Sequence, residues 1–129
     1  MASKEKFIKE LAAAFQEFIV YDELVPELTK LIHKTGESKR FTNMLIKRLD
    51  FLSEYREFAH LHHEEFEQID ETLYSMHLSS NNFNIRILYA FNDDGTVLLL
   101  AFYERGGKSA TDYTHKIPEA MQRLRSMEE

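Results

Sequence analysis

The chain has 129 residues, of which 43% are hydrophobic and 29% charged, and its formal net charge is −6. This composition is typical of a soluble globular protein, and we expect one domain, residues 1–129, with a helical part (1–69) followed by a sheet and a final helix (70–129). The absence of cysteine excludes a disulfide scaffold, a thiolate zinc site and a cysteine nucleophile. The net negative charge argues against non-specific binding to nucleic acid.

Neither a membrane span nor a signal peptide is expected. The longest strongly apolar run, Val97 to Phe102, is far too short to cross a bilayer. Met1 to Lys9 leads into a charged amphipathic segment instead of the apolar core of a signal peptide. We therefore expect a cytoplasmic protein with no membrane partner.

The chain begins with a helical pattern. Apolar residues recur at spacings of three and four from Phe7 to Ile19, which predicts a first helix with Ser3 as its candidate N-cap. Pro26 fits the first turn of a second helix, and Gly36 stands just past the end of that helix.

A third helix is predicted to open at Ser38, with an apolar stripe that runs from Phe41 to Leu52. The polar run that follows, Glu54 to Gln68, is compatible with helix but has no clear apolar face. The first 69 residues are therefore expected to be helical.

The second half of the chain changes to a strand-like period. Phe83 to Phe91 alternates strictly between two faces, and Thr72 to Leu78 and Thr96 to Glu104 are strand-like as well. Ser79 to Asn82 and Asn92 to Gly95 are short-turn signals between these segments. The pattern predicts an antiparallel meander of three strands, or slightly more.

The third strand of this meander is apolar on both faces, so we expect it to be covered on both sides, by helices on at least one. Pro118 is expected to start a last helix that turns Ile117, Met121 and Leu124 inward. The fold class is therefore α+β, with N-terminal helices, the sheet meander and a C-terminal helix.

A histidine cluster lies between the two halves. If the segment is helical, His60, His63, Glu64 and Glu67 share one side at spacings of three and four, as metal ligands often do. The segment lacks the His-Glu-x-x-His pattern, since Glu67 stands at the last position. The alternative is a solvated polar helix end, so His60 and His63 are weak candidates and no metal is assigned.

Polar and cationic side chains gather around the predicted strands, and those of functional interest are His77, Arg86, Arg105, Lys108, Tyr113 and His115. Residues at the ends of adjacent antiparallel strands can converge on one patch. An arginine in the middle of a strand, such as Arg86, is costly unless it faces water or a partner anion. The alternative is an ion pair between Arg86 and a nearby acid such as Asp112 or Glu104.

Three segments of the second half, Leu73 to Leu78, Phe83 to Tyr89 and Leu99 to Arg105, carry a recognisable pattern. Because of these segments the second half resembles the RelE/ParE toxin superfamily, and more closely its phage-derived HigB-like branch. Family members read roughly L-[YWF]-E-L-R, then Y-R followed by two hydrophobic residues and Y, then L-L-H-x-F-x-K-K and K-T, with a last helix E-I-x-x-A-x-x-R. Further positions in step with the pattern are Phe102, Arg105, Lys108-Ser109, Ile117, Ala120 and Arg123.

The resemblance implies a RelE-like fold and the toxin of a type II toxin–antitoxin system, held inactive by a cognate antitoxin protein. Such enzymes are endoribonucleases that cleave mRNA, often on the ribosome, without a metal or another cofactor. A basic or imidazole group takes the 2′-hydroxyl proton, cations stabilise the phosphorane, and an acid protonates the 5′-oxygen.

Position by position, the resemblance implies a catalytic set of His77, Arg86, Arg105, Lys108 and Tyr113. Arg86 matches the second-strand arginine and would stabilise the transition state. Arg105 or Lys108 matches the cation after the last strand, and Tyr113 resembles the late tyrosine. His77 stands where the family usually has arginine or lysine, and an imidazole is a competent general base or acid near neutral pH.

Two other functions are kept open. The chain could be a non-catalytic phage or prophage module that binds a protein partner on the same scaffold. That module should have these cations scattered or neutralised and an apolar patch exposed, whereas a ribonuclease should gather them into one cleft. A metal-binding protein that uses His60 and His63 is the weaker third function.

Overall fold

The structure is a computed structural model that describes residues 3–104 and 109–128. The first half is mainly helical, with α1 (Lys4–Ala14), α2 (Leu24–Ile32), α3 (Ser38–Tyr55) and α4 (Ala59–His62). Two short 3₁₀ turns lie in this half, η1 (His33–Thr35) and η2 (Arg56–Phe58). The remaining elements are β1 (Ile19–Val20), β2 (Phe66–Gln68), β3 (Tyr74–Ser79), β4 (Asn84–Asn92), β5 (Gly95–Tyr103) and α5 (Ser109–Met127).

The strands form one five-stranded sheet in the order β1-β5-β4-β3-β2. The β3-β4-β5 meander predicted from the sequence is confirmed, and its neighbouring strands are antiparallel. The sheet is larger than the meander and is mixed, because β1 pairs with β5 in parallel and β2 adds an antiparallel edge. The fold is α+β, with helices at both ends of the chain.

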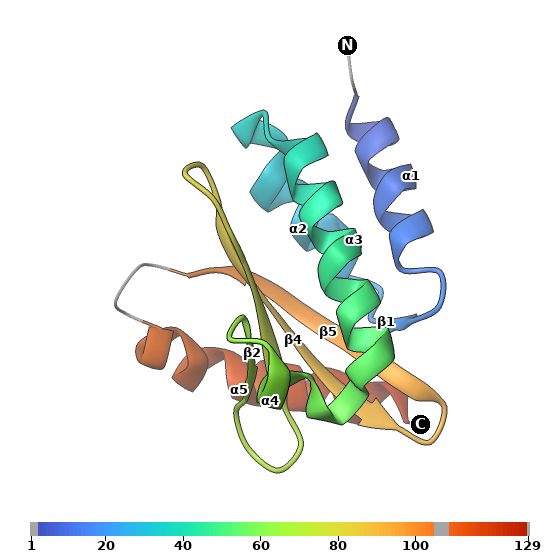
Figure 1. Ribbon diagram of the computed structural model, residues 1–129, viewed down its shortest axis with the longest axis vertical. Coiled ribbons are helices and arrows are strands. Elements are labelled where there is room, and N and C mark those ends of the chain that lie inside the picture. Colours follow the sequence, from blue (N-terminus) through green and yellow to red (C-terminus); the bar gives the residue numbers. More distant parts are fainter. Residues whose placement is uncertain (1–2, 105–108, 129) are drawn as a thin grey trace.

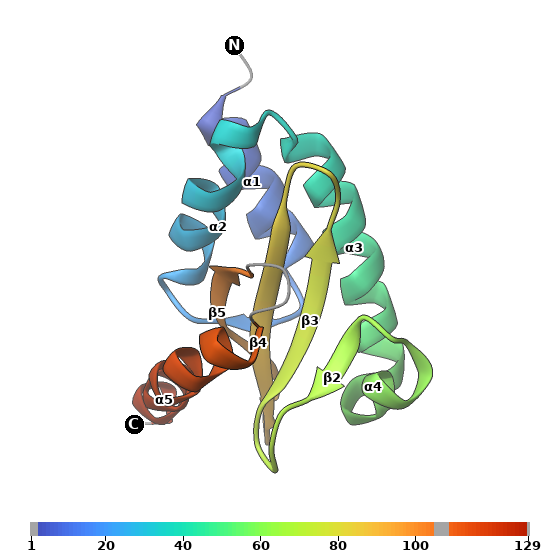
Figure 2. The ribbon, with the colours of Figure 1, turned by 90° about the vertical axis from the view of Figure 1, so that its left-hand side faces the viewer.

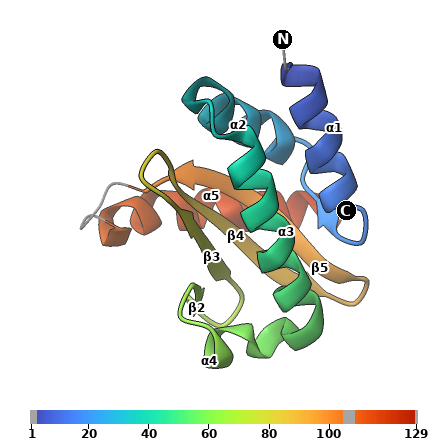
Figure 3. The same ribbon diagram turned by 45° about the horizontal axis from the view of Figure 1, so that its top comes forward.

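Three helices cover one face of the sheet. Figures 1 and 3 show α1, α2 and α3 on the same side, away from α5. The helices and the sheet bury a shared apolar core on this side, and its sheet members include Met76, Ile85, Ile87, Tyr89 and Leu98. Phe41 of α3 lies edge-on to both Phe7 of α1 and Phe83, with ring centroids 6.3 and 5.4 Å apart.

The opposite face is only partly covered. Figure 2 shows α5 over β5 and β4, while β3 and β2 lie outside its path. Ala120 and Leu124 of α5 pack with Leu88, Leu100 and Phe102 in a second apolar core. The predicted burial of the third strand on both sides is therefore confirmed, because Val97 to Phe102 is buried throughout. Polar residues of β2, β3 and β4 occupy the rest of this face.

Arg123 fastens α5 to the rest of the protein. Its guanidinium donates to the Leu99 carbonyl of β5 at 2.8 Å and is ion-paired with Glu27 of α2. The same guanidinium lies 4.6 Å from the centroid of the Tyr21 ring. Glu27 in turn accepts the backbone N–H of Ala101 at 3.2 Å, so the ion pair also satisfies backbone groups along the outer edge of β5.

Local sequence signals account for the helix ends that were predicted correctly. The Ser3 side chain accepts the Lys6 N–H at 3.0 Å, as an N-cap does. Gly36 adopts a φ of 75°, a left-handed conformation that glycine enters at little cost, and α3 begins at Ser38 as expected. Pro26 lies in the first turn of α2.

Three predicted element boundaries were wrong. The first helix ends at Ala14, and Ile19 belongs to β1, which is held by pairing with β5. Helix α3 ends at Tyr55 because Arg56 takes a positive φ of 50°, so the run to Gln68 is a turn, a short helix and β2. Pro118 lies inside α5. The burial of Ala120 and Leu124 beyond it offsets the hydrogen bond that proline cannot donate.

No helix in residues 3–104 or 109–128 combines the length and the apolar character that a membrane crossing requires.

Candidate functional site

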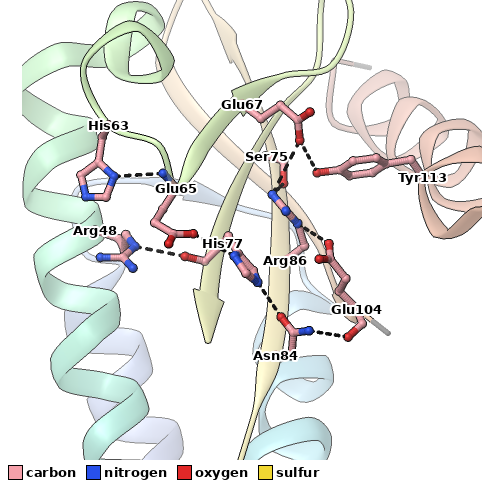
Figure 4. Close-up of polar contacts among 10 residues, drawn as sticks. All are labelled: Arg48, His63, Glu65, Glu67, Ser75, His77, Asn84, Arg86, Glu104 and Tyr113. Atoms are coloured by element: carbon pink, nitrogen blue, oxygen red, sulfur yellow. Dashed lines mark hydrogen bonds and ion pairs between the residues drawn. The ribbon is translucent and has the colours of Figure 1, made fainter. Parts of the chain in front are cut away.

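A cross-strand pair of His77 and Arg86 marks the site. The two residues lie directly opposite each other on β3 and β4, so their side chains share the sheet face on which α5 lies. Ser75, two residues before His77, shares this face, and Glu67 of β2 lies opposite Ser75. Glu104 follows β5, and Tyr113 reaches in from α5 (Figure 4). We call Glu67, Ser75, Arg86, Glu104 and Tyr113 the Arg86 cluster.

Arg86 is held on two sides by carboxylates. Its Nε donates to Glu104, and the two side chains are only 15% and 9% exposed, so this is a buried ion pair. Its Nη1 makes longer contacts, at 3.4 Å to Ser75 Oγ and 3.7 Å to a Glu67 oxygen. The guanidinium carbon also lies 5.7 Å from the centroid of the Tyr113 ring, within cation–π range. Arg86 is therefore firmly held at Nε and more loosely at its terminal nitrogen.

The surroundings of Arg86 and Tyr113 fix their protonation states. Burial acts to lower the pKa of Arg86, but the hydrogen bond to Glu104 and the nearby negative charges raise it overall. Burial raises the pKa of Tyr113, although the hydrogen bond with Ser75 and the positive charge of Arg86 oppose this. Tyr113 is thus a neutral phenol that donates its hydrogen to Glu67 at 2.8 Å.

His77 lies in a second polar network beside the Arg86 cluster. Its Nδ1 is 2.8 Å from a Glu65 carboxylate oxygen, and its Nε2 faces the side-chain oxygen of Asn84. The amide of Asn84 is oriented by its own donation to the Glu104 carbonyl at 2.7 Å. Because both ring nitrogens face oxygen acceptors, a ring that carries two protons satisfies both contacts. The Nε of Arg48, on α3, donates a hydrogen bond to the backbone carbonyl of His77 at 3.1 Å.

The structure therefore brings together His77, Arg86 and Tyr113 of the predicted set. Arg105 and Lys108 lie outside the described residues, and so does the side chain of Asp112. The alternative in which Arg86 pairs with Glu104 is confirmed.

Sequence reasoning missed Glu65 and Glu67 as members of the site. The run around them carries no strand period, and the three-residue β2 exists through its pairing with β3. Without knowing that β2 pairs with β3, one could not predict that these carboxylates face His77 and Arg86.

The histidine cluster does not form the predicted helical face. Helix α4 ends at His62, His63 is extended, and Glu67 lies on β2. Instead, His63 Nδ1 accepts the Glu65 N–H at 3.1 Å, and the ring packs edge-on against Phe51 and Phe66. Within residues 3–104 and 109–128, no group of three or more His, Asp or Glu side chains is arranged to hold a metal ion.

Comparisons of the chain with protein-family models, with curated proteins and with solved structures found no match. The case for an activity therefore depends on the residues of the site and on the chemistry that they allow.

Proposed function

We propose that the chain is a toxin of a type II toxin–antitoxin pair, related to the HigB-like branch of the RelE/ParE superfamily. In this proposal it cleaves mRNA on the ribosome in the cytoplasm, without a metal, and a cognate antitoxin holds it inactive. The supporting observation is that a guanidinium, an imidazole, a neutral phenol and a half-exposed carboxylate gather on one sheet face. These are the group types that ribonucleolytic acid–base chemistry needs.

The proposed reaction uses the 2′-hydroxyl of the RNA as the nucleophile. The 2′-oxygen attacks the adjacent phosphorus, the bond to the 5′-oxygen breaks, and the products carry a 2′,3′-cyclic phosphate and a 5′-hydroxyl. Glu67, which is 52% exposed, takes the 2′-hydroxyl proton, and its acceptor oxygen is positioned by Tyr113. The imidazole of His77 acts as the general acid and supplies a ring proton to the leaving 5′-oxygen.

Arg86 stabilises the negative charge that develops on the phosphorane. Its buried pair with Glu104 fixes the guanidinium, whereas its contact with Glu67 is long and half-exposed. An exposed ion pair contributes only about 0–1 kcal/mol, so a phosphate oxygen can replace Glu67 at Nη1 at little cost. The proposal assigns Arg105 and Lys108 to the same task of binding and stabilising phosphate.

One observation favours a second candidate, a non-catalytic module that binds a protein on the same scaffold. Three carboxylates, Glu65, Glu67 and Glu104, lie against His77 and Arg86. In the F-x-K-K pattern that the chain resembles, the first lysine falls at Glu104. A site with this excess of acids attracts a cationic partner more strongly than it attracts RNA.

An in vitro translation reaction separates the two candidates. Purified wild-type chain is added to translating ribosomes, and the mRNA ends are mapped and tested for a cyclic phosphate. The informative variant is the double substitution Arg86→Gln/Glu104→Gln, because it removes the guanidinium without leaving a buried carboxylate unpaired. Arg40→Gln is the matched control, since Arg40 is 61% exposed and lies on α3.

The ribonuclease proposal predicts cleavage by the wild type and by Arg40→Gln, and none by the folded double variant. Equal cleavage by all three chains would refute the role of the Arg86 cluster. If no chain cleaves mRNA with ribosomes present, the binding-module candidate is favoured instead.

A further inference from the structure

Helices α1 and α2 form an open groove on the side of the protein that carries no part of the Arg86 cluster. The groove has a volume of about 790 Å³ and is bounded by Lys4 and Ile8 of α1 and by residues from Val25 to Lys34. We propose that this groove binds an acidic amphipathic helix of a partner protein. The inference stands apart from the ribonuclease proposal and does not depend on it.

The floor of the groove is apolar. Ile8 is 37% exposed, although it is a large apolar residue, and Val25 and Pro26 lie across from it at the groove surface. Thr29 adds little polarity, because its hydroxyl donates to the Val25 carbonyl at 2.8 Å within α2. A partner that covers this floor would therefore remove apolar surface from water, which favours binding.

The rim of the groove is cationic. Lys4 stands on the α1 side, and Lys30, His33 and Lys34 stand on the side of α2 and its 3₁₀ extension, while no acidic residue among those described lines this groove. The whole chain carries net charge −6, so this local excess of positive charge is opposite in sign to the average. Charge complementarity therefore selects a negatively charged occupant.

The shape of the groove and the positions of its cations fit an acidic helix better than a fatty acid or an RNA strand. The α2 side spans Val25 to Lys34, which is about 14 Å at the helical rise, or more than two turns of a docked helix. Cations flank the apolar floor on both sides, whereas a fatty-acid carboxylate needs a cation at one end only. An RNA strand would leave the apolar floor without a complementary surface, because the described residues of the groove include no aromatic ring for base stacking.

A second groove, between α1 and α3, shows that the cationic rim is confined to the first groove. Its charged lining residues within the described part of the chain are Glu10, Glu17 and Asp50, all acidic, around apolar groups that include Ile46. The two grooves lie on opposite flanks of α1 and differ in the sign of their charge. A partner helix that carries acids should therefore discriminate between them.

The test uses a synthetic peptide of about 20 residues, which is longer than the roughly 12–15 residues below which an isolated helix is marginal in water. It carries leucine at helical spacings of three and four, glutamate elsewhere and a fluorescent label. Binding to the full chain is followed by anisotropy. We expect saturable binding, weakened at least about tenfold by Lys30→Glu/Lys34→Glu and by Ile8→Glu. Lys9→Glu/Lys47→Glu makes the same charge change on exposed lysines outside the groove and should leave the affinity unchanged.

Several results would overturn the proposal. The first is a lack of peptide binding to the wild type, and the second is equal weakening by the two double variants. The third is tighter binding of a matched peptide that carries lysine in place of glutamate. Sodium dodecanoate and a single-stranded RNA oligonucleotide are tested as competitors. If either binds the groove while the acidic peptide does not, the assignment to a helix is wrong. Circular dichroism of each variant confirms that a loss of binding does not reflect unfolding.

Discussion

Loss of the Arg86 guanidinium should destabilise the protein strongly, and most of that loss should disappear when the charge of Glu104 is removed as well. The two side chains are 15% and 9% exposed and are joined by a hydrogen bond from Nε. Arg86→Gln leaves a buried carboxylate without its cation. Glu104→Gln leaves Arg86 with the longer contact to Glu67 at 3.7 Å.

The magnitudes follow from the burial of the pair. Breaking a buried ion pair from one side costs about 3–5 kcal/mol, and the residual exposure here places Arg86→Gln near 3 kcal/mol. Glu104→Gln keeps an acceptor oxygen and should cost about 1–2 kcal/mol. The double variant carries no uncompensated charge and should cost about 2 kcal/mol or less. The coupling energy between the two sites is therefore about 2–3 kcal/mol.

Urea denaturation followed by circular dichroism measures each free energy of unfolding. With an m-value of about 1.5 kcal/mol/M, Arg86→Gln should lower the midpoint by about 2 M. The control Arg40→Gln removes an exposed pair with Glu37 at 3.6 Å and should shift stability by less than about 0.5 kcal/mol. Additive effects of the two single substitutions, within about 0.5 kcal/mol, would refute the buried pair.

Three further predictions concern the two cores and the tyrosines. Tyr89→Phe should raise the free energy of unfolding by about 1 kcal/mol in urea titrations, because the Tyr89 hydroxyl is buried and has no hydrogen-bond partner within the described part of the chain. A clear loss of stability would contradict this. Arg123→Ala should cost about 3 kcal/mol in the same assay, since it leaves the Glu27 carboxylate without its cation and the Leu99 carbonyl without the guanidinium donor, and a neutral effect would show that this contact does not hold α5 in place. Burial raises the pKa of Tyr74, Tyr89 and Tyr113, so the native state keeps phenol protons that the unfolded chain releases near pH 10, and stability should fall as the pH rises above about 10. Tyrosinate absorbance in native and denatured samples checks this, and identical titration curves would refute it.

The sequence predicted those parts of the fold in which local pattern and tertiary environment agree. Strict alternation from Phe83 to Phe91 indicated β4, and the turn at Asn92 to Gly95 indicated its hairpin with β5. The same alternation assigned Arg86 to a face different from that of Ile85. Helix α3 likewise followed from Ser38 as its first residue and from its apolar stripe.

Elements that depend on distant partners were not predictable in this way. Strands β1 and β2 have two and three residues, too few for any period, and they are defined by their pairing with β5 and β3. Helix α5 begins before Pro118, although proline at that position resembles a helix start. The start of α5 is set by the packing of its apolar side against the sheet, and not by the position of Pro118.

The site was predictable to the same extent. His77 and Arg86 belong to strands with a clear period, so their convergence could be expected. The carboxylates that set the charge of the site could not, because Glu67 depends on β2. Glu104 was foreseen only as one of two acids that could pair with Arg86. The identity of the pairing acid determines whether Arg86 is oriented or free. Which acid pairs with Arg86 could be learned only from the structure.

The most direct test of the proposed function is inducible expression of the wild-type chain in a bacterium, beside the folded Arg86→Gln/Glu104→Gln variant. Growth and mRNA integrity are followed together, and soluble protein is measured for both chains. The account predicts growth arrest with mRNA cleavage for the wild type and neither for the variant. Normal growth with intact mRNA and abundant soluble wild-type protein would contradict it.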